Sequence, residues 1–160
     1  MVTFISHSPA ETEALGEAWG RAAAPGLVIG LSGDLGAGKT QLVRGLSRGL
    51  SIAQRVHSPT FALVNNYAGG RLPLAHLDLY RLDTLDQIFG TGLEEYLQPE
   101  GVAVIEWVER WFGPWPLSAG APGVCENRTG TAKLPRNLRW ARLESVGETE
   151  RQIVYEDFVA

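Results

Sequence analysis

A glycine-rich octapeptide lies in the first quarter of the chain, Gly33-Asp34-Leu35-Gly36-Ala37-Gly38-Lys39-Thr40. It matches the pattern G-x-x-x-x-G-K-[ST] at every fixed position. A short apolar run, Leu27 to Ser32, precedes it, and a segment with apolar residues at helical spacing begins at Lys39. The sequence therefore predicts a buried strand, a phosphate-binding loop and a helix, in that order.

The residue types of this loop suit the phosphates of a nucleotide. Glycines let successive backbone N–H groups converge on phosphate oxygens, which a Cβ would obstruct. The helix that follows adds unpaired N–H groups and the positive end of its dipole. Lys39 supplies a cation for the β- and γ-phosphates, and the Thr40 hydroxyl can ligate Mg²⁺. We expect nucleotide contacts from the whole octapeptide and from Gln41.

Two helices are expected around this loop. The first begins at Ser8-Pro9-Ala10-Glu11, which combines an N-cap serine, a proline at the first helical position and a glutamate three residues after the cap. Its expected apolar face holds Leu15, Ala18, Trp19 and Ala22, and Pro25-Gly26 ends it. The second helix is expected to turn Leu42, Val43, Leu46 and Leu50 inward.

The second half of the chain alternates strands with helical segments. The expected elements are a hairpin of Phe61–Tyr67 and Leu72–Leu79, a helix over Leu85–Leu97 interrupted near Gly90 and Gly92, a strand at Val102–Glu106, and closing strands at Leu138–Leu143 and Arg151–Tyr155. This order predicts one α/β domain over residues 1–160. We expect three layers, a mixed but mainly parallel central sheet, and an inserted surface loop at 112–135.

Two carboxylates are candidates for the metal and the reaction. Period-two alternation places His76, Asp78 and Tyr80 on one face of their strand, so Asp78 can ligate Mg²⁺ directly or through water. Glu106 ends the apolar strand Val102–Glu106, where open α/β sheets hold their ligands. It can be a second Mg²⁺ ligand or orient the attacking water. Each carboxylate could instead be an ordinary exposed residue.

Three further positions are candidates near the nucleotide. The stretch Ser58-Pro59-Thr60 places two hydroxyls on a proline-stiffened loop, which could sense the γ-phosphate as switch loops do, although such sequences are common in turns. Trp107 could cover the nucleotide or pack in the core.

Composition restricts the class of protein. The chain has 160 residues, a net charge of −4 and 44% apolar residues, which excludes general disorder. One cysteine cannot form an internal disulfide, and no charge-free stretch is long and apolar enough for a membrane span. The first residues carry no secretory pattern, so we expect a cytoplasmic protein. Five basic residues and no acidic one lie between positions 127 and 143, which indicates either a solvated face or a docking strip for RNA or an acidic protein.

Together, the motifs GDLGAGKT, SPTF followed by ALV, HLDLYRL and IEWVER resemble the TsaE family of small bacterial P-loop ATPases. The resemblance runs from Glu11 to about Arg110. Beyond that point the chain departs from the family pattern, because Leu134-Pro135 follows Trp107 by 27 residues and the family reaches this pair much sooner.

The resemblance implies a role in tRNA modification. Family members act with the TsaB–TsaD pair, which attaches a threonylcarbamoyl group to the adenosine beside the anticodon, so contact with tRNA is indirect. They bind ATP with Mg²⁺ and hydrolyse it weakly. The family's motif residues fall here at Lys39 and Thr40, at Ser58 and Thr60, at Asp78 and Glu106 for magnesium, and at Trp107. Lys39, Asp78 and Glu106 are the expected catalytic residues. The family's N-terminal T-x-x-L-G pattern places Thr12 near the nucleotide.

Two other functions remain open from the sequence. A small-molecule kinase would need an acceptor pocket, and no segment between Thr60 and Leu97 reads as one. A nucleotide-gated binding module without hydrolysis would use the same loop and differ only in rate. A GTPase is disfavoured because the chain lacks an N-K-x-D motif.

Overall fold

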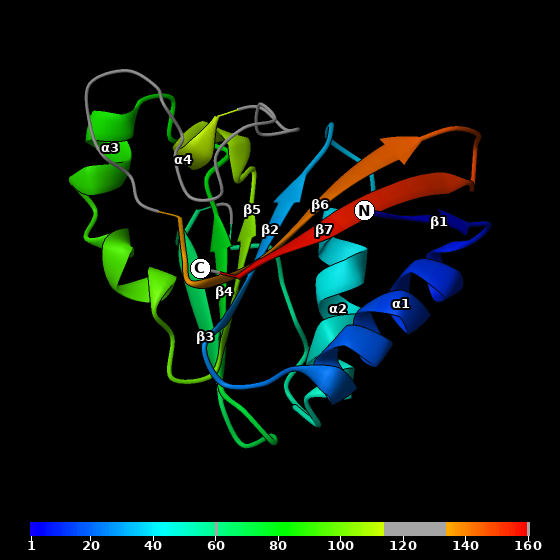
Figure 1. Ribbon diagram of the computed structural model, residues 1–160, viewed down its shortest axis with the longest axis horizontal. Helices are drawn as coiled ribbons and strands as arrows, with labels where there is room; N and C mark the ends of the chain where they lie inside the picture. Colours follow the sequence, from blue (N-terminus) through cyan, green and yellow to red (C-terminus); the bar gives the residue numbers. More distant parts are fainter. Residues whose placement is uncertain (60, 114–133, 160) are drawn as a thin grey trace.

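The computed structural model describes residues 1–59, 61–113 and 134–159, which form a seven-stranded sheet with helices on both faces (Figure 1). The spatial order is β1-β7-β6-β2-β5-β4-β3. The strands are β1 (Val2–Ser6), β2 (Leu27–Ser32), β3 (Val64–Tyr67), β4 (Leu74–Asp78), β5 (Val102–Glu106), β6 (Asn137–Ser145) and β7 (Arg151–Val159).

The centre of the sheet is parallel and its margins are antiparallel. Strands β6, β2, β5 and β4 run parallel to one another, whereas β7 and β1 on one side and β3 on the other pair antiparallel. Strands β3 and β4 form the hairpin expected after the second helix. The predicted mixed α/β sheet is confirmed.

The helices divide into two layers. Helices α1 (Pro9–Ala22) and α2 (Lys39–Gly49) cover one face, and α3 (Leu85–Phe89), the 3₁₀ helix η1 (Leu93–Leu97) and α4 (Glu109–Phe112) cover the other (Figure 1). Each face of the sheet has its own hydrophobic core, one centred on residues such as Ile29 and Leu46 and the other on residues such as Ile105 and Trp140. These two cores give the expected three layers.

Strand β1 was not expected from the sequence. It pairs with β7 from Val2 opposite Tyr155 to Ser6 opposite Arg151. As an edge strand it leaves Val2 and Ile5 exposed, so its sequence shows no clean alternation of apolar and polar residues.

The predicted start of the surface loop at 112–135 is too early in the sequence. Phe112 is the last residue of α4 and is buried, so the expectation that it starts a surface loop is wrong. A four-residue helix is too short to leave a periodic signal. Residues 114–133, which contain most of this expected insertion, lie outside the described residues. Leu134 packs against the core on the α4 side of the sheet.

Helices α1 and α2 approach each other through glycines, and the apolar face expected for α1 is confirmed only at Leu15 and Trp19. Ala18 and Ala22 are exposed, while Gly16 and Gly20 are buried beside Trp19. A Cβ on Gly16 would overlap the carbonyl oxygen of Leu42, and one on Gly20 would overlap that of Leu46. The two backbones are therefore closer than any larger residue permits.

We expect replacement of Gly45 by alanine to destabilise the protein. Alanine in a helix normally stabilises relative to glycine, but here its Cβ would overlap the Glu13 carbonyl of α1. The overpacking predicts a loss of about 1–3 kcal/mol in the free energy of unfolding, measured with urea. The matched control is Gly147→Ala, because its Cβ would meet only ordinary contacts and should leave stability within about 0.5 kcal/mol. A Gly45→Ala variant as stable as the control would contradict this account of the helix pair.

Candidate functional site

The predicted phosphate loop joins the end of β2 to the start of α2. Three of its residues adopt positive φ, with Gly33 at 140°, Gly36 at 80° and Gly38 at 101°. Side chains at these angles would be strained, and a Cβ on Gly33 would also overlap the Leu143 carbonyl. The loop thus needs glycine at these positions for its own backbone path.

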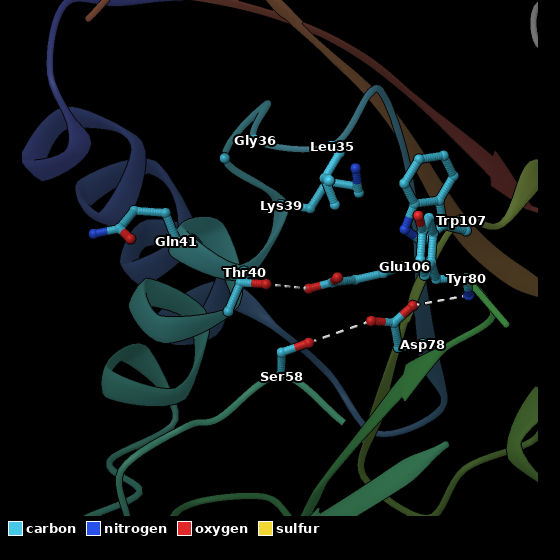
Figure 2. Close-up of a pocket in the computed structure, with 11 residues that line it drawn as sticks. Leu35, Gly36, Lys39, Thr40, Gln41, Ser58, Asp78, Tyr80, Glu106 and Trp107 are labelled. Atoms are coloured by element: carbon cyan, nitrogen blue, oxygen red, sulfur yellow. Dashed lines mark hydrogen bonds between the residues drawn. The ribbon is translucent and has the colours of Figure 1, made fainter. Parts of the chain in front are cut away.

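Beside the loop lies a cleft of about 350 Å³ (Figure 2). It is lined by residues from the loop, α2, the segment before β3, and the ends of β4 and β5. These residues are Leu35, Gly36, Gly38, Lys39, Thr40, Gln41, Ser58, Asp78, Tyr80, Glu106 and Trp107. Ten of the eleven were expected from the sequence to form the site, and the exception is Tyr80.

The remaining predicted residues lie around this cleft. Gly33 and Asp34 line a second pocket of about 360 Å³, and Ala37 is buried in the core. Pro59 is buried, and its carbonyl accepts a hydrogen bond from the Leu63 N–H. Thr60 lies outside the described residues.

Thr12 sits under the loop rather than in the cleft. Its side chain is buried, with its hydroxyl 2.7 Å from that of Ser6. Its methyl carbon would lie 3.9 Å from a Cβ on Gly38. Thr12 therefore supports the loop from the α1 side.

Lys39 is held inside the loop. Its ammonium donates to the carbonyl oxygens of Gly33 and Asp34, at 2.5 and 2.9 Å. Burial lowers the pKa of Lys39, and the nearby carboxylates, Glu106 first among them, oppose that shift. The cation is thus only partly compensated by its surroundings, and an anion in the cleft would complete its electrostatic environment.

Two carboxylates meet at the opposite side of the cleft from the loop. Glu106 Oε1 accepts a hydrogen bond from the Thr40 hydroxyl at 2.9 Å, which joins the end of β5 to the start of α2. Asp78 Oδ2 accepts from the Ser58 hydroxyl at 3.3 Å, and its Oδ1 accepts from the Tyr80 N–H at 2.9 Å (Figure 2). Both carboxylates are 3% exposed, so they are oriented rather than free to rotate.

The oxygen ligands gathered here fit Mg²⁺. Mg²⁺ prefers one or two carboxylates, with water and phosphate oxygens completing an octahedron. The Thr40 hydroxyl with Asp78 and Glu106 supplies such a partial set. Within the described ranges no group of three or more His, Cys, Asp and Glu side chains is arranged to hold a metal ion.

Trp107 lies across the mouth of the loop. It has φ of 62°, a left-handed conformation that a bulky residue rarely adopts, directly after β5. Its ring centroid lies 4.2 Å from the Lys39 ammonium and 5.2 Å from the Tyr80 ring. It is half-buried and lines the cleft, so it does more than fill the core.

Two residues of the site received no role from the sequence. His76 is fully buried, with Nε2 3.0 Å from Glu106 Oε1. Tyr80 lines the cleft next to Trp107. The period-two pattern placed both residues on the same face of the strand as Asp78, and this was the one feature of the sequence that could have indicated them. It could not show that His76 reaches a residue thirty positions away on the neighbouring strand.

A mixed sheet with a parallel centre, and a glycine-rich loop between its central strand and a helix, defines a P-loop NTPase-like fold. The family model described as "Threonylcarbamoyl adenosine biosynthesis protein TsaE" matches residues 6–122, and the chain belongs to this family.

Individual relatives agree with this assignment. The chain is 44% identical over 100 residues to the tRNA threonylcarbamoyladenosine biosynthesis protein TsaE of Bacillus subtilis, covering 62% of each chain. It is 50% identical over 100 residues to the protein of that name from Nostoc, covering 60% of this chain and 61% of the relative. The chain thus spans about six-tenths of the length of these curated relatives.

A solved structure shares the fold. The crystal structure of YdiB from B. subtilis is similar with a TM-score of 0.71 and 29% identity, covering 99% of this chain and 86% of that one. No helix within the described ranges is long and apolar enough to cross a membrane.

We expect Lys39→Met to stabilise the protein when no nucleotide is present. A lowered lysine pKa means that the folded state disfavours the charged form, so Lys39 lowers the free energy of unfolding at pH 7. This reduction in the free energy of unfolding disappears as the pH rises from the pKa of Lys39 in the folded protein toward its ordinary value of 10.5. The difference between variant and wild type should therefore be largest near pH 7 and shrink at alkaline pH, as measured by urea unfolding at both. A variant less stable than wild type at pH 7 would show that the two carbonyl contacts outweigh the cost of burial.

Proposed function

We propose that this protein binds ATP with Mg²⁺ in the cleft and hydrolyses it weakly, in support of threonylcarbamoyl modification of tRNA adenosine. One observation carries the proposal. The Thr40 hydroxyl, at the start of α2, donates to Glu106 at the end of β5, beside the oriented Asp78. This contact brings the Thr40 hydroxyl and the two carboxylates together beside the glycine-rich loop, and that arrangement supports binding of Mg²⁺ and phosphate.

In this proposal the loop holds the phosphates. Backbone N–H groups of the loop and of the first turn of α2 bind their oxygens, and the helix dipole favours their negative charge. Lys39 then exchanges the Gly33 and Asp34 carbonyls for anionic oxygens, which removes much of the cost of its burial. The Trp107 ring, in contact with Lys39, covers the phosphates from the other side.

The carboxylates serve the metal and the water. Bound Mg²⁺ would neutralise charge that develops on the phosphates during hydrolysis. Thr40 and Asp78 would hold it, and Glu106 would either join them or orient the attacking water. The Ser58 hydroxyl, already in contact with Asp78, lets the 58–60 loop respond to the third phosphate. This loop is our candidate for the element that signals the nucleotide state.

The biological role is proposed from the relatives. Their name, tRNA threonylcarbamoyladenosine biosynthesis protein, assigns them to that process. We propose that this chain acts there through a TsaB–TsaD complex, contacts tRNA only indirectly, and works in the cytoplasm where tRNA is modified. A slow ATPase is consistent with a nucleotide switch that resets such a partner.

Glu106→Gln is expected to separate binding from hydrolysis. The amide keeps the size of the side chain and can still accept from Thr40, but it cannot act as a base or a strong metal ligand. We expect affinity for ATP without metal, measured by calorimetry, to stay within a few-fold, and phosphate release to fall about 10²-fold or more. Lys39→Met is the matched comparison, because it should lose ATP binding itself. Wild-type turnover in Glu106→Gln would exclude that residue from the reaction.

Partner dependence is tested by phosphate release with and without a purified TsaB–TsaD pair. We expect the pair to increase turnover about tenfold or more, because an element supplied at the interface can complete a slow P-loop site. Phosphate must appear as free inorganic phosphate, which distinguishes hydrolysis from kinase activity. Tight ATP binding with no stimulation would favour a nucleotide-gated module instead.

A further inference from the structure

A fully buried histidine lies behind the two carboxylates. His76 occupies the middle of β4, which is flanked by β5 and β3. Alternation along the strand places it with Leu74 and Asp78 on the face covered by α2, and its neighbour in the register of β5 is Val104. An imidazole at 0% exposure on a largely apolar face must satisfy its polar atoms inside the protein.

Only one ring nitrogen of His76 has a partner in the described part of the chain. Nε2 lies 3.0 Å from Glu106 Oε1, and Nδ1 is buried with no hydrogen-bond partner. The carboxylate oxygen accepts, so Nε2 carries the hydrogen. A hydrogen on Nδ1 as well would be buried without an acceptor, which is costly. The contacts therefore assign a hydrogen to Nε2, which donates it to Glu106.

One oxygen of Glu106, Oε1, accepts two hydrogen bonds from residues of different elements. Thr40, at the cleft end, donates to Glu106 Oε1 at 2.9 Å, and His76, from inside the sheet, donates at 3.0 Å. Two donors on one oxygen fix the rotation of the carboxylate about its own axis. They leave Oε2 for the groups of the cleft.

We propose that His76 is a positioning residue that holds the Glu106 carboxylate in the orientation required for its role at the metal and the attacking water. This inference rests on the proposed function of Glu106, but the orientation itself does not. Without His76, Glu106 would keep the Thr40 contact alone and could rotate. Its alignment would then have to be restored each time nucleotide binds.

The tautomer is tested first, without nucleotide, by ¹⁵N NMR of the full chain. The chain has three histidines, so the signals of His76 can be assigned by their loss in a His76→Gln variant. We expect a slowly exchanging Nε2–H whose signal changes in Glu106→Ala. An Nε2 without a hydrogen, or rapid exchange of the hydrogen between the two ring nitrogens, would overturn the proposed contact whether or not the protein binds ATP.

The functional consequence is tested with a pair of substitutions. His76→Leu fills the space without a donor, whereas His76→Gln places an amide N–H at about the reach of Nε2. We expect His76→Leu to lower phosphate release about 10–100-fold and to remove most of the gain in ATP affinity that Mg²⁺ provides. Affinity for ATP without metal should be unchanged, and His76→Gln should restore most of both losses.

Leu74→Ala is the control for packing, because Leu74 is buried on the same face of β4 but donates no hydrogen bond. It should lower the unfolding temperature while keeping the Mg²⁺ effect on ATP affinity. Equal losses in His76→Leu, His76→Gln and Leu74→Ala would reduce His76 to a packing residue and overturn the proposal. Wild-type behaviour in His76→Leu would do the same. A wild-type chain that binds no ATP would instead refute the proposed function, and the NMR result would still decide the orientation.

Discussion

The site depends on the parallel pairing of β4, β5 and β2. In this register Glu106 lies opposite Leu31 on one side and Asp78 on the other, so both carboxylates reach the edge where β2 turns into the glycine-rich loop. A shift of one residue in either pairing would turn a carboxylate to the other face of the sheet. The Thr40–Glu106 hydrogen bond then ties that edge to α2.

Burial fixes the orientation of the side chains in this site, and it also makes their charges costly in free energy. Lys39, His76, Asp78 and Glu106 are all 5% exposed or less, in a region where unpaired charge is expensive. Each is held by specific hydrogen bonds, so the side chains are aligned before any ligand arrives. The lowered pKa of Lys39 shows that the alignment is not fully compensated in the protein alone. A phosphate would supply negative charge beside Lys39, and a divalent cation would supply positive charge beside Asp78 and Glu106.

The glycine-mediated contact between α1 and α2 supports the loop from behind. It brings α1 close enough for Gln41 to donate to Glu13, and the Thr12 methyl group would lie 3.9 Å from a Cβ built on Gly38. The first turn of α2 carries both Lys39 and Thr40, so this packing sets where the cation and the hydroxyl stand. Stability of the helix pair and geometry of the cleft are therefore coupled.

The sequence alone determined the local elements whose signals are short-range. The loop motif, the Ser8 cap, the apolar strands and the candidate positions Lys39, Thr40, Asp78 and Glu106 follow from residue types and periodicity, and the structure brings these four side chains into one cleft.

Tertiary structure decided what depends on contacts between distant segments. It added the edge strand β1, which pairs with the far end of the chain. It buried Gly16 and Gly20 of α1 and left Ala18 and Ala22 exposed, because the distance between two helices depends on both of them. It also joined His76 to Glu106, since one strand's periodicity gives the face of a residue but not its partner on the next strand.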